Sequence, residues 1–146
     1  MKPVSVNYAF GFAPPRTPCV LCMESGQGCT LQTTEWFTWL NIKRNPMLSF
    51  SMPRGSEASA LKEGDSFVLA FPPAEEALRY PQPVYAERGA ELPAGTIPAE
   101  TAGYRGPIPK GSELLLRCTL AGAYNYPFKK VRIFNCNLEE ALGSPD

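Results

Sequence analysis

The sequence predicts a mainly β protein, a barrel or sandwich of short strands with a few short helices. Sixteen prolines and twelve glycines divide the 146 residues into short runs, as is typical of all-β folds. Residues 47–52 and 130–134 alternate between apolar and polar side chains, which is the period-2 pattern of a strand. A chain of this length with 44% hydrophobic residues suits one core, so we expect a single domain over residues 1–146.

The first third of the chain predicts a β-hairpin followed by an aromatic element. An apolar run over residues 18–23, turn residues over 24–28 and a Thr-rich run over 29–34 are typical of a hairpin. The aromatic segment 35–40 could continue a strand or begin a short turn of helix, and Pro46 ends whichever it is.

The alternating segment 47–52 predicts a strand with two different faces. We expect its apolar residues to face the core and Ser49 and Ser51 to lie on the other face. Residues 56–63 contain good helix formers behind Ser56 as a cap, and Gly64 stands where a helix would stop, so a short helix is expected there.

The remaining predicted elements lie on either side of a long irregular segment. Residues 66–71 form an apolar strand, and residues 74–79 one more helical turn. Prolines and glycines over residues 80–110 predict a long loop without regular elements, which is either functional or mobile. Its Tyr85, Arg88, Tyr104 and Arg105 could cover a ligand. Residues 112–120 and 129–135 predict two final strands before a polar tail.

Composition excludes several classes of partner. Fourteen basic and fourteen acidic residues cancel, so no net field attracts nucleic acid or an anionic membrane. The N-terminal residues lack the apolar stretch of a signal peptide, and no segment is long enough to span a bilayer. We therefore expect a cytoplasmic protein whose partner is a small molecule or another protein.

The cysteines and the absence of histidine limit the chemistry. Five cysteines, an odd number, without an export signal favour reduced thiols over disulfides. Cys19 and Cys22 on one strand would point to opposite faces, so buried thiols are favoured over a shared metal ion. Without histidine, Ser-His and Cys-His nucleophiles and most zinc sites are excluded. If the protein is an enzyme, a cofactor is expected to carry the chemistry.

Three segments in succession resemble the flavin-reductase-like FMN-binding proteins, including the flavoredoxin branch. Residues 18–22 resemble the family's opening proline and apolar strand, and residues 30–37 resemble its Asn-Ala-x-Thr-x-Ser-Trp-Phe stretch. Residues 45–52 resemble its Pro-Pro-Leu-(apolar)-Ser strand. Residues 53–59 stand in place of a short loop bearing Arg, Ser and Thr. The resemblance covers about residues 17 to 72 and is weaker beyond.

The resemblance implies an FMN-binding split β-barrel of six strands, with FMN held at the interface of a homodimer. Residues on the second strand would face the flavin ring and ribityl chain, residues on the third strand would lie beside them, and residues of the following loop would bind phosphate. The implied cofactor-binding residues are Thr30, Gln32, Thr33, Thr34, Trp36, Ser49, Ser51, Arg54, Ser56 and Ser59. Either Ser56 or Ser59 would match the family's threonine.

The chemistry of these residues fits that division. A phosphate dianion needs a guanidinium, hydroxyls and, where available, a helix N-terminus, and Arg54 and Ser56 directly before the predicted helix provide them. A flavin ring needs amide or hydroxyl partners along one edge and an aromatic wall, for which Gln32, Thr33 and Trp36 are suitable.

Other interpretations of the same residues are possible, and the sequence departs from the family pattern at two positions. Threonine is common in any strand, Arg54 before Gly55 suits a solvated turn, and packing in the core or in a dimer suits Trp36 better than cofactor stacking does. Glu35 replaces the family's serine before tryptophan, and a carboxylate there would disfavour the anionic reduced flavin unless it points to solvent. The histidine that many relatives carry after the phosphate loop is missing.

The function implied is an FMN-binding oxidoreductase. The flavin would accept hydride from NAD(P)H and pass electrons to free flavin, a metal complex or a protein, with no catalytic side chain required. One alternative is a non-catalytic FMN-binding electron-transfer protein, favoured if the 80–110 segment covers the flavin. Another is a cofactor-free dimeric ligand-binding barrel.

Overall fold

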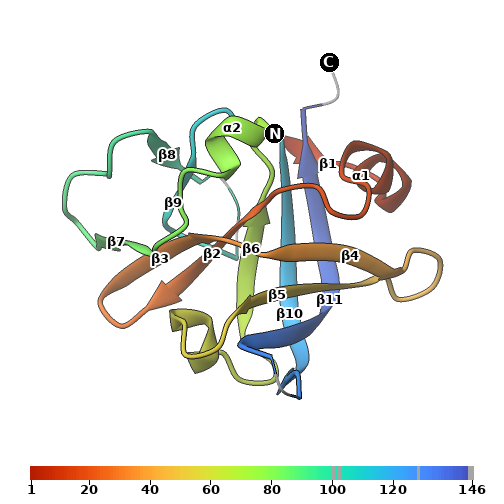
Figure 1. Cartoon of the computed structure of the whole chain (residues 1–146). Helices are drawn as coiled ribbons and strands as arrows, with labels where there is room; N and C mark the ends of the chain where they lie inside the picture. The colour runs from red at the N-terminus through yellow and green to blue at the C-terminus, as the bar shows by residue number, and fades with distance from the viewer. Residues whose placement is uncertain (100, 102, 128, 145–146) are drawn as a thin grey trace.

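Strands are the main elements of the structure, a computed structural model that describes residues 1–99, 101, 103–127 and 129–144 (Figure 1). The strands are β1 (Lys2–Pro3), β2 (Val20–Ser25), β3 (Gly28–Thr33), β4 (Trp36–Asn41), β5 (Met47–Pro53), β6 (Ser66–Ala70), β7 (Val84–Glu87), β8 (Thr96–Pro98), β9 (Pro107–Pro109), β10 (Leu114–Asn125) and β11 (Val131–Gly143). The helical elements are α1 (Val6–Phe12), the 3₁₀ turn η1 (Glu57–Ala60) and α2 (Ala74–Ala77).

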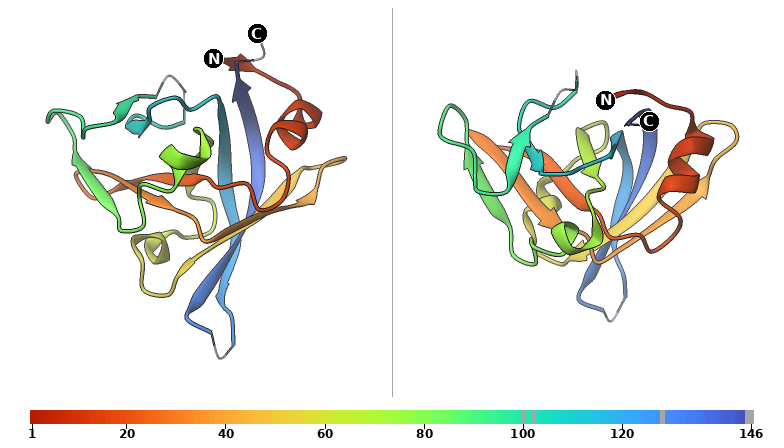
Figure 2. Two further views of the ribbon diagram at one scale, coloured as in Figure 1. Left: turned by 45° about the horizontal axis from the view of Figure 1, so that its top comes forward. Right: turned by 90° about the horizontal axis from the view of Figure 1, so that it is seen from above.

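The large sheet is antiparallel and curls around an apolar core (Figure 2). Its strand order is β4-β5-β11-β10-β6-β2-β3-β7, with β1 paired beside β11. Within the described residues the end strands β4 and β7 do not pair with each other. The barrel is therefore split, as expected from the sequence, although it contains more strands than the six expected.

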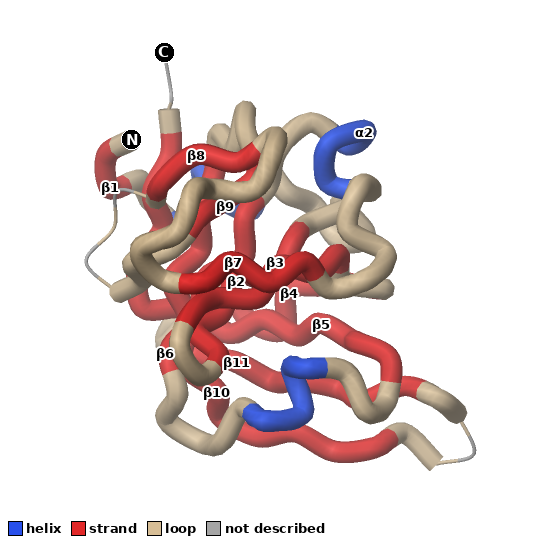
Figure 3. The backbone as a smooth tube through the Cα atoms, turned by 90° about the vertical axis from the view of Figure 1, so that its left-hand side faces the viewer, coloured by secondary structure: helices blue, strands red, loops and turns tan. Residues whose placement is uncertain are grey.

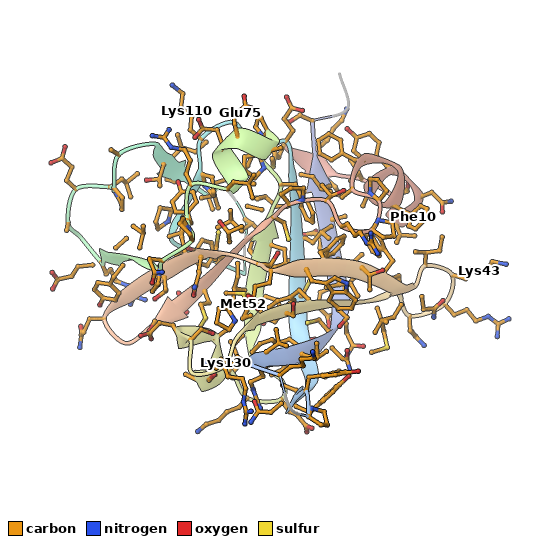
Figure 4. The ribbon with its side chains drawn as sticks, viewed as in Figure 1. Phe10, Lys43, Met52, Glu75, Lys110 and Lys130 are labelled. Carbon is orange, nitrogen blue, oxygen red and sulfur yellow. The ribbon has the colours of Figure 1, made fainter. Side chains whose placement is uncertain are left out.

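Aromatic side chains fill the barrel interior. Phe50 on β5 stacks on Phe134 of β11 with ring centroids 5.0 Å apart, and it meets Phe67 of β6 edge-on at 5.6 Å. All three side chains are fully buried, and each such burial contributes about 1.5–3 kcal/mol. The period-2 alternation of β5 sends Met52 into the same core (Figure 4). The opposite face of β5 is thereby left to its serines.

A second apolar cluster covers the outer face of β2, β3 and β6. Tyr104 and Ile108, from the segment after β7, pack against Leu31 of β3 and Val68 of β6. Figure 3 shows β8 and β9 lying over this side of the barrel. The prediction that residues 80–110 lack regular elements is wrong, because β7 pairs with β3, and β8 pairs with β9. These short pairings satisfy backbone groups in spite of the prolines.

Most of the predicted strands are confirmed. The hairpin is β2 and β3, with Gly26 at φ +58° in its turn. The aromatic segment that could be strand or helix is strand β4, which pairs with β5. The segments at 66–71, 112–120 and 129–135 correspond to β6, β10 and β11.

Three further expectations need correction, and two elements were not foreseen. The helix expected over 56–63 is only the 3₁₀ turn Glu57–Ala60, and Ser56, at its N-cap position, makes no side-chain capping hydrogen bond. The helical turn expected over 74–79 is confirmed only for Ala74–Ala77. The expected polar tail is instead the second half of β11, which continues to Gly143. Strand β1 and helix α1, which Ser5 caps by accepting from the Tyr8 amide at 3.1 Å, were not expected.

Strands β10 and β11 form a long hairpin that extends beyond the barrel body (Figure 2). Register shifts between Arg117 and Cys118, and between Leu120 and Gly122, mark irregularities at which a long ribbon bends. The far end of this hairpin, here called the arm (residues 122–127 and 129–133), lies against β5 and the turn that follows it.

Candidate functional site

Near the end of β3, the side-chain amide of Gln32 is held in place by one hydrogen bond. Gln32 is only 6% exposed, and its Nε2 donates to the Pro81 carbonyl at 3.4 Å. Its Oε1 is buried and has no hydrogen-bond partner within the described residues. Because one N–H of the amide is committed to Pro81 and Oε1 has no partner among these residues, Oε1 is the buried group that Gln32 offers to a ligand.

The turn after β5 brings a guanidinium and a hydroxyl beside this amide. The Arg54 backbone N donates to the Lys130 carbonyl at 3.0 Å, and its Nη1 donates to the Lys129 carbonyl at 3.3 Å. Gly55 has φ +81°, a conformation that glycine adopts without strain. Ser56 Oγ is buried and has no partner among the described residues. The arm therefore holds the turn in place while the Ser56 hydroxyl remains available.

These groups border one hollow of about 340 Å³, formed by Gln32, residues 53–57 and residues 81–83. We call it the Arg54 hollow. Its volume lies in the range of small-ligand sites. Among the described residues that line it, Arg54 is the only one with a cationic side chain. Its carboxylate, that of Glu57, accepts from Ser25 Oγ at 3.5 Å, and in the described part of the chain no acid pairs with Arg54.

A larger, apolar hollow lies on the outer face of β4, β5, β11 and β10. This sheet-face groove measures about 610 Å³. Trp36, Leu40, Ser49, Ser51, Tyr124, Tyr126, Lys129, Val131, Ile133 and Asn135 line it. Both serines point away from the core, as the alternation predicted, and both are nonetheless buried. Ser49 Oγ has no partner in the described residues.

A third hollow of about 220 Å³ lies where the chain enters β4. It is lined by Arg16, Thr34, Glu35 and Trp36 among others. Arg16 has φ 71°, an uncommon conformation for a residue with a side chain. The Thr34 hydroxyl lies 3.2 Å from Cys19 Sγ and donates to the Cys19 carbonyl at 3.3 Å. Glu35 is exposed, so its carboxylate is solvated.

The predicted site residues are divided among these hollows. Gln32, Arg54 and Ser56 share the Arg54 hollow, and Trp36, Ser49 and Ser51 share the sheet-face groove. The two hollows adjoin, because Pro53 of the first is the register partner of Val131 of the second.

Three predicted residues lie elsewhere. Thr30 and Ser59 line none of the hollows described above, and Ser59 is exposed on η1. The Thr33 hydroxyl makes a short hydrogen bond of 2.5 Å to the Ala77 carbonyl and accepts from the Tyr80 amide at 3.3 Å. It is engaged in holding α2 and the following residues onto the sheet. The anion-binding helix N-terminus expected after Ser56 is also absent from the described fold, because η1 is a single 3₁₀ turn.

The long segment contributes less to the site than its aromatic and basic residues suggested. Pro81, Gln82 and Pro83 border the Arg54 hollow. Tyr104 is instead buried in the second core, where its hydroxyl donates to the Pro107 carbonyl at 2.8 Å, and Arg88 pairs with Glu24 at 3.5 Å. Tyr104 therefore covers the outer face of the sheet. The contact that the sequence did not predict is the Pro81 carbonyl, which accepts from Gln32.

The cysteines are buried thiols, as expected. All five are free and buried, and Cys19 and Cys22 enter different apolar clusters. Burial raises the pKa of Cys19 to about 12 and the pKa of Cys22 well above its ordinary value. Neutral buried thiols are poor nucleophiles. Among the described residues, no group of His, Cys, Asp and Glu could hold a metal ion, and no helix is long and apolar enough to cross a bilayer.

The fold matches known structures, although no family model and no curated protein sequence matches the chain. Flavoredoxin from Methanosarcina acetivorans is 15% identical with a TM-score of 0.65, over 90% of this chain and 70% of that one. BorF, the flavin reductase component of a bacterial two-component tryptophan halogenase, is 19% identical with a TM-score of 0.66, over 96% and 88%. The Streptomyces globisporus NADH:FAD oxidoreductase, in complex with NAD and FAD fragments, is 16% identical with a TM-score of 0.65, over 96% and 81%. The chain therefore has the split-barrel fold of the flavin-reductase-like proteins.

Proposed function

We propose that this protein is a flavin-binding oxidoreductase of the flavin-reductase-like type, with FMN held in the Arg54 hollow and along the adjoining sheet face. The observation that supports this most directly is a pair of buried polar atoms, Gln32 Oε1 and Ser56 Oγ, that have no hydrogen-bond partner within the described residues. They lie beside the Arg54 guanidinium, which forms no ion pair within the same residues. Buried polar atoms in native proteins are nearly always hydrogen-bonded, so two orphans at one hollow favour a polar ligand there.

The phosphate of FMN fits the Arg54 side of the hollow. A guanidinium and a hydroxyl form charge-assisted hydrogen bonds to phosphate oxygens, and Arg54 and Ser56 are sequence neighbours held by the same turn. Of the two serines that the sequence left as alternatives, Ser56 borders the hollow and Ser59 does not.

The rest of the flavin fits the acceptor on β3 and the serine-bearing sheet face. Gln32 Oε1 can accept from a ribityl hydroxyl or from the ring N–H, both of which are donors. Trp36 and Ser51, which are register partners on β4 and β5, offer an aromatic surface and a hydroxyl on the same face. The role of these residues is to bind the flavin and to orient its ring.

A flavin held by these residues would supply the redox chemistry, namely hydride transfer from a reduced nicotinamide. No side chain of the hollow needs to act as acid or base, which agrees with a chain without histidine. The buried residues of the 80–110 segment, among them Tyr80, Tyr104 and Ile108, pack on the outer face of β2, β3 and β6. That placement leaves the hollow accessible and favours a reductase over a carrier whose flavin is covered.

A second copy of the chain is the proposed partner for the sheet-face groove. Trp36 is 39% exposed, Leu40 52% and Tyr124 48%, and together they line an apolar hollow at the surface. Exposed apolar patches of this kind mark interaction sites. A homodimer would bury them and enclose the flavin from the side that one chain leaves open.

The experiment that tests the activity is anaerobic reduction of the FMN-loaded protein by NADH and by NADPH, followed by absorbance near the visible flavin band. Bleaching by either donor within seconds supports the reductase. A flavin that stays bound and oxidised while dithionite bleaches it would replace the reductase with the electron-transfer protein. Absence of a bound flavin would favour the cofactor-free barrel.

A further inference from the structure

The rim between the Arg54 hollow and the sheet-face groove carries a second cation that FMN would not use. Lys129 lines the groove, and its own carbonyl accepts the hydrogen bond from Arg54 Nη1 at 3.3 Å. Arg54 and Lys129 are therefore in direct contact through the backbone, one on each side of the boundary. Within the described residues Lys129 makes no ion pair.

The groove beside Lys129 also offers an aromatic surface. Tyr126 lines the same end of the groove, and its backbone N donates to the Val131 carbonyl at 3.0 Å. Val131 is the register partner of Pro53, which borders the Arg54 hollow. Lys129 and Tyr126 thus occupy the end of the groove nearest Arg54, whereas Leu40 lies toward the other end, where β4 pairs with Leu48 and Met47.

We propose that Lys129 forms a second anion subsite next to Arg54, which takes the diphosphate of a dinucleotide. This inference rests on the proposed flavin site. One phosphate at Arg54 and Ser56 would place the next phosphate along the rim toward the Lys129 ammonium, and Tyr126 gives the attached nucleoside an aromatic face. A mononucleotide such as FMN ends at Arg54 and leaves Lys129 unused.

Two ligands carry this chemistry, namely FAD and the nicotinamide donor. In the first case Lys129 selects FAD over FMN. In the second case it contributes to the binding of NADH or NADPH while FMN occupies the flavin site. The diphosphate is common to both, and the experiment separates them.

The test compares Lys129→Glu with Lys130→Glu in the full-length protein. Lys130, labelled in Figure 4, is the adjacent residue and lines neither hollow, so its reversal changes the net charge equally. Dissociation constants for FMN and FAD are measured by flavin fluorescence at low salt. KM values for NADH and for reduced nicotinamide mononucleotide, which lacks the adenosine phosphate, are measured with FMN as the flavin.

The expected result is a selective loss in Lys129→Glu. If FAD supplies the diphosphate, FAD binding weakens about five- to tenfold while FMN is nearly unchanged, and added salt reduces the difference. If the donor supplies it, KM for NADH rises by a similar factor while that for the mononucleotide does not. Three results would overturn the subsite. In the first, Lys129→Glu weakens FMN binding as much as FAD binding and leaves both donor KM values unchanged. In the second, it changes the binding of no ligand, and in the third, Lys130→Glu has the same effect as Lys129→Glu. Failure of the wild type to bind any flavin would instead refute the proposed function itself.

Discussion

Arg54 and Gln32 are proposed to recognise opposite ends of one ligand, so their substitution separates the two contacts. Arg54→Ala removes the guanidinium, and we expect the binding free energy of FMN to weaken by about 1–2 kcal/mol. This loss is smaller than that for a buried charged hydrogen bond because Arg54 is exposed to solvent. Riboflavin, which has no phosphate, should bind as to the wild type. Fluorescence titration with both ligands checks this, and equal losses would move Arg54 away from the phosphate.

We expect Gln32 to contribute equally to the affinity for FMN and for riboflavin. Gln32→Leu removes the acceptor Oε1 and the hydrogen bond to Pro81. The flavin donor then has no partner, which costs about 1–2 kcal/mol for FMN and for riboflavin. The control is Gln82→Leu, because Gln82 borders the same hollow but is exposed. Unchanged affinity in Gln32→Leu, with the folded state verified by circular dichroism, would show that the amide does not contact the ligand.

At the scale of elements, Thr33 holds α2 and the residues after it onto β3. Thr33→Val removes the hydroxyl and leaves the Tyr80 amide and the Ala77 carbonyl without this partner. We expect the free energy of unfolding in urea to fall by about 1–2 kcal/mol. Thr33→Ser keeps the hydroxyl and should retain most of that stability. If valine and serine variants are equally stable, the hydroxyl does not fasten this element.

The hairpin β2–β3 and Cys19, the residue directly before it, contain thiols that stay neutral in the folded state. Burial raises the pKa of Cys19 from 9.0 to about 12, so the folded state favours the protonated thiol more than the unfolded state does. Its contribution is complete below about pH 9 and is lost as pH rises from there toward 12. Urea unfolding at pH 8 and pH 10 should show lower stability at pH 10, with a smaller decrease in Cys19→Ala. An equal decrease in both would assign the effect to other groups.

Strands with regular alternation could be predicted from sequence, and strands defined by distant partners could not. Residues 47–52 carry their own two-faced pattern, and the structure confirms both faces. Strand β9 reads Pro-Ile-Pro, which argues against a strand locally, yet all three residues are buried against the sheet and pair with β8. The last part of β11 appears polar because Asn137 and Glu139 are on its exposed face.

In the candidate site, too, some residues could be predicted from the sequence and others could not. Gln32, Arg54 and Ser56 could be predicted to meet because they lie within one stretch that resembles a known family. Pro81 and Lys129 could not, since each reaches the site through tertiary contacts: one accepts from Gln32 and the other from Arg54. Thr33 also lies in the stretch that resembles the family, but its hydroxyl is engaged with Ala77 and Tyr80 within the fold.

At the scale of the whole molecule, the apolar sheet face should govern assembly. We expect a dimer of twice the 16.0 kDa chain mass. Leu40→Glu places a charge on the exposed patch and should shift the protein to monomer, as measured by sedimentation equilibrium. Leu92→Glu is the matched control, because Leu92 is 40% exposed but does not line the groove. A wild-type monomer, or equal dissociation in both variants, would remove the groove as the interface.

Binding of FMN at the Arg54 hollow of this split barrel can be measured by titrating FMN with the purified protein. Flavin fluorescence is followed as protein is added, with riboflavin titrated in parallel. We expect saturable quenching with one flavin per chain and tighter binding of FMN than of riboflavin, because only FMN carries the phosphate for Arg54 and Ser56. No saturable change with either flavin, or equal affinity for both, would contradict it.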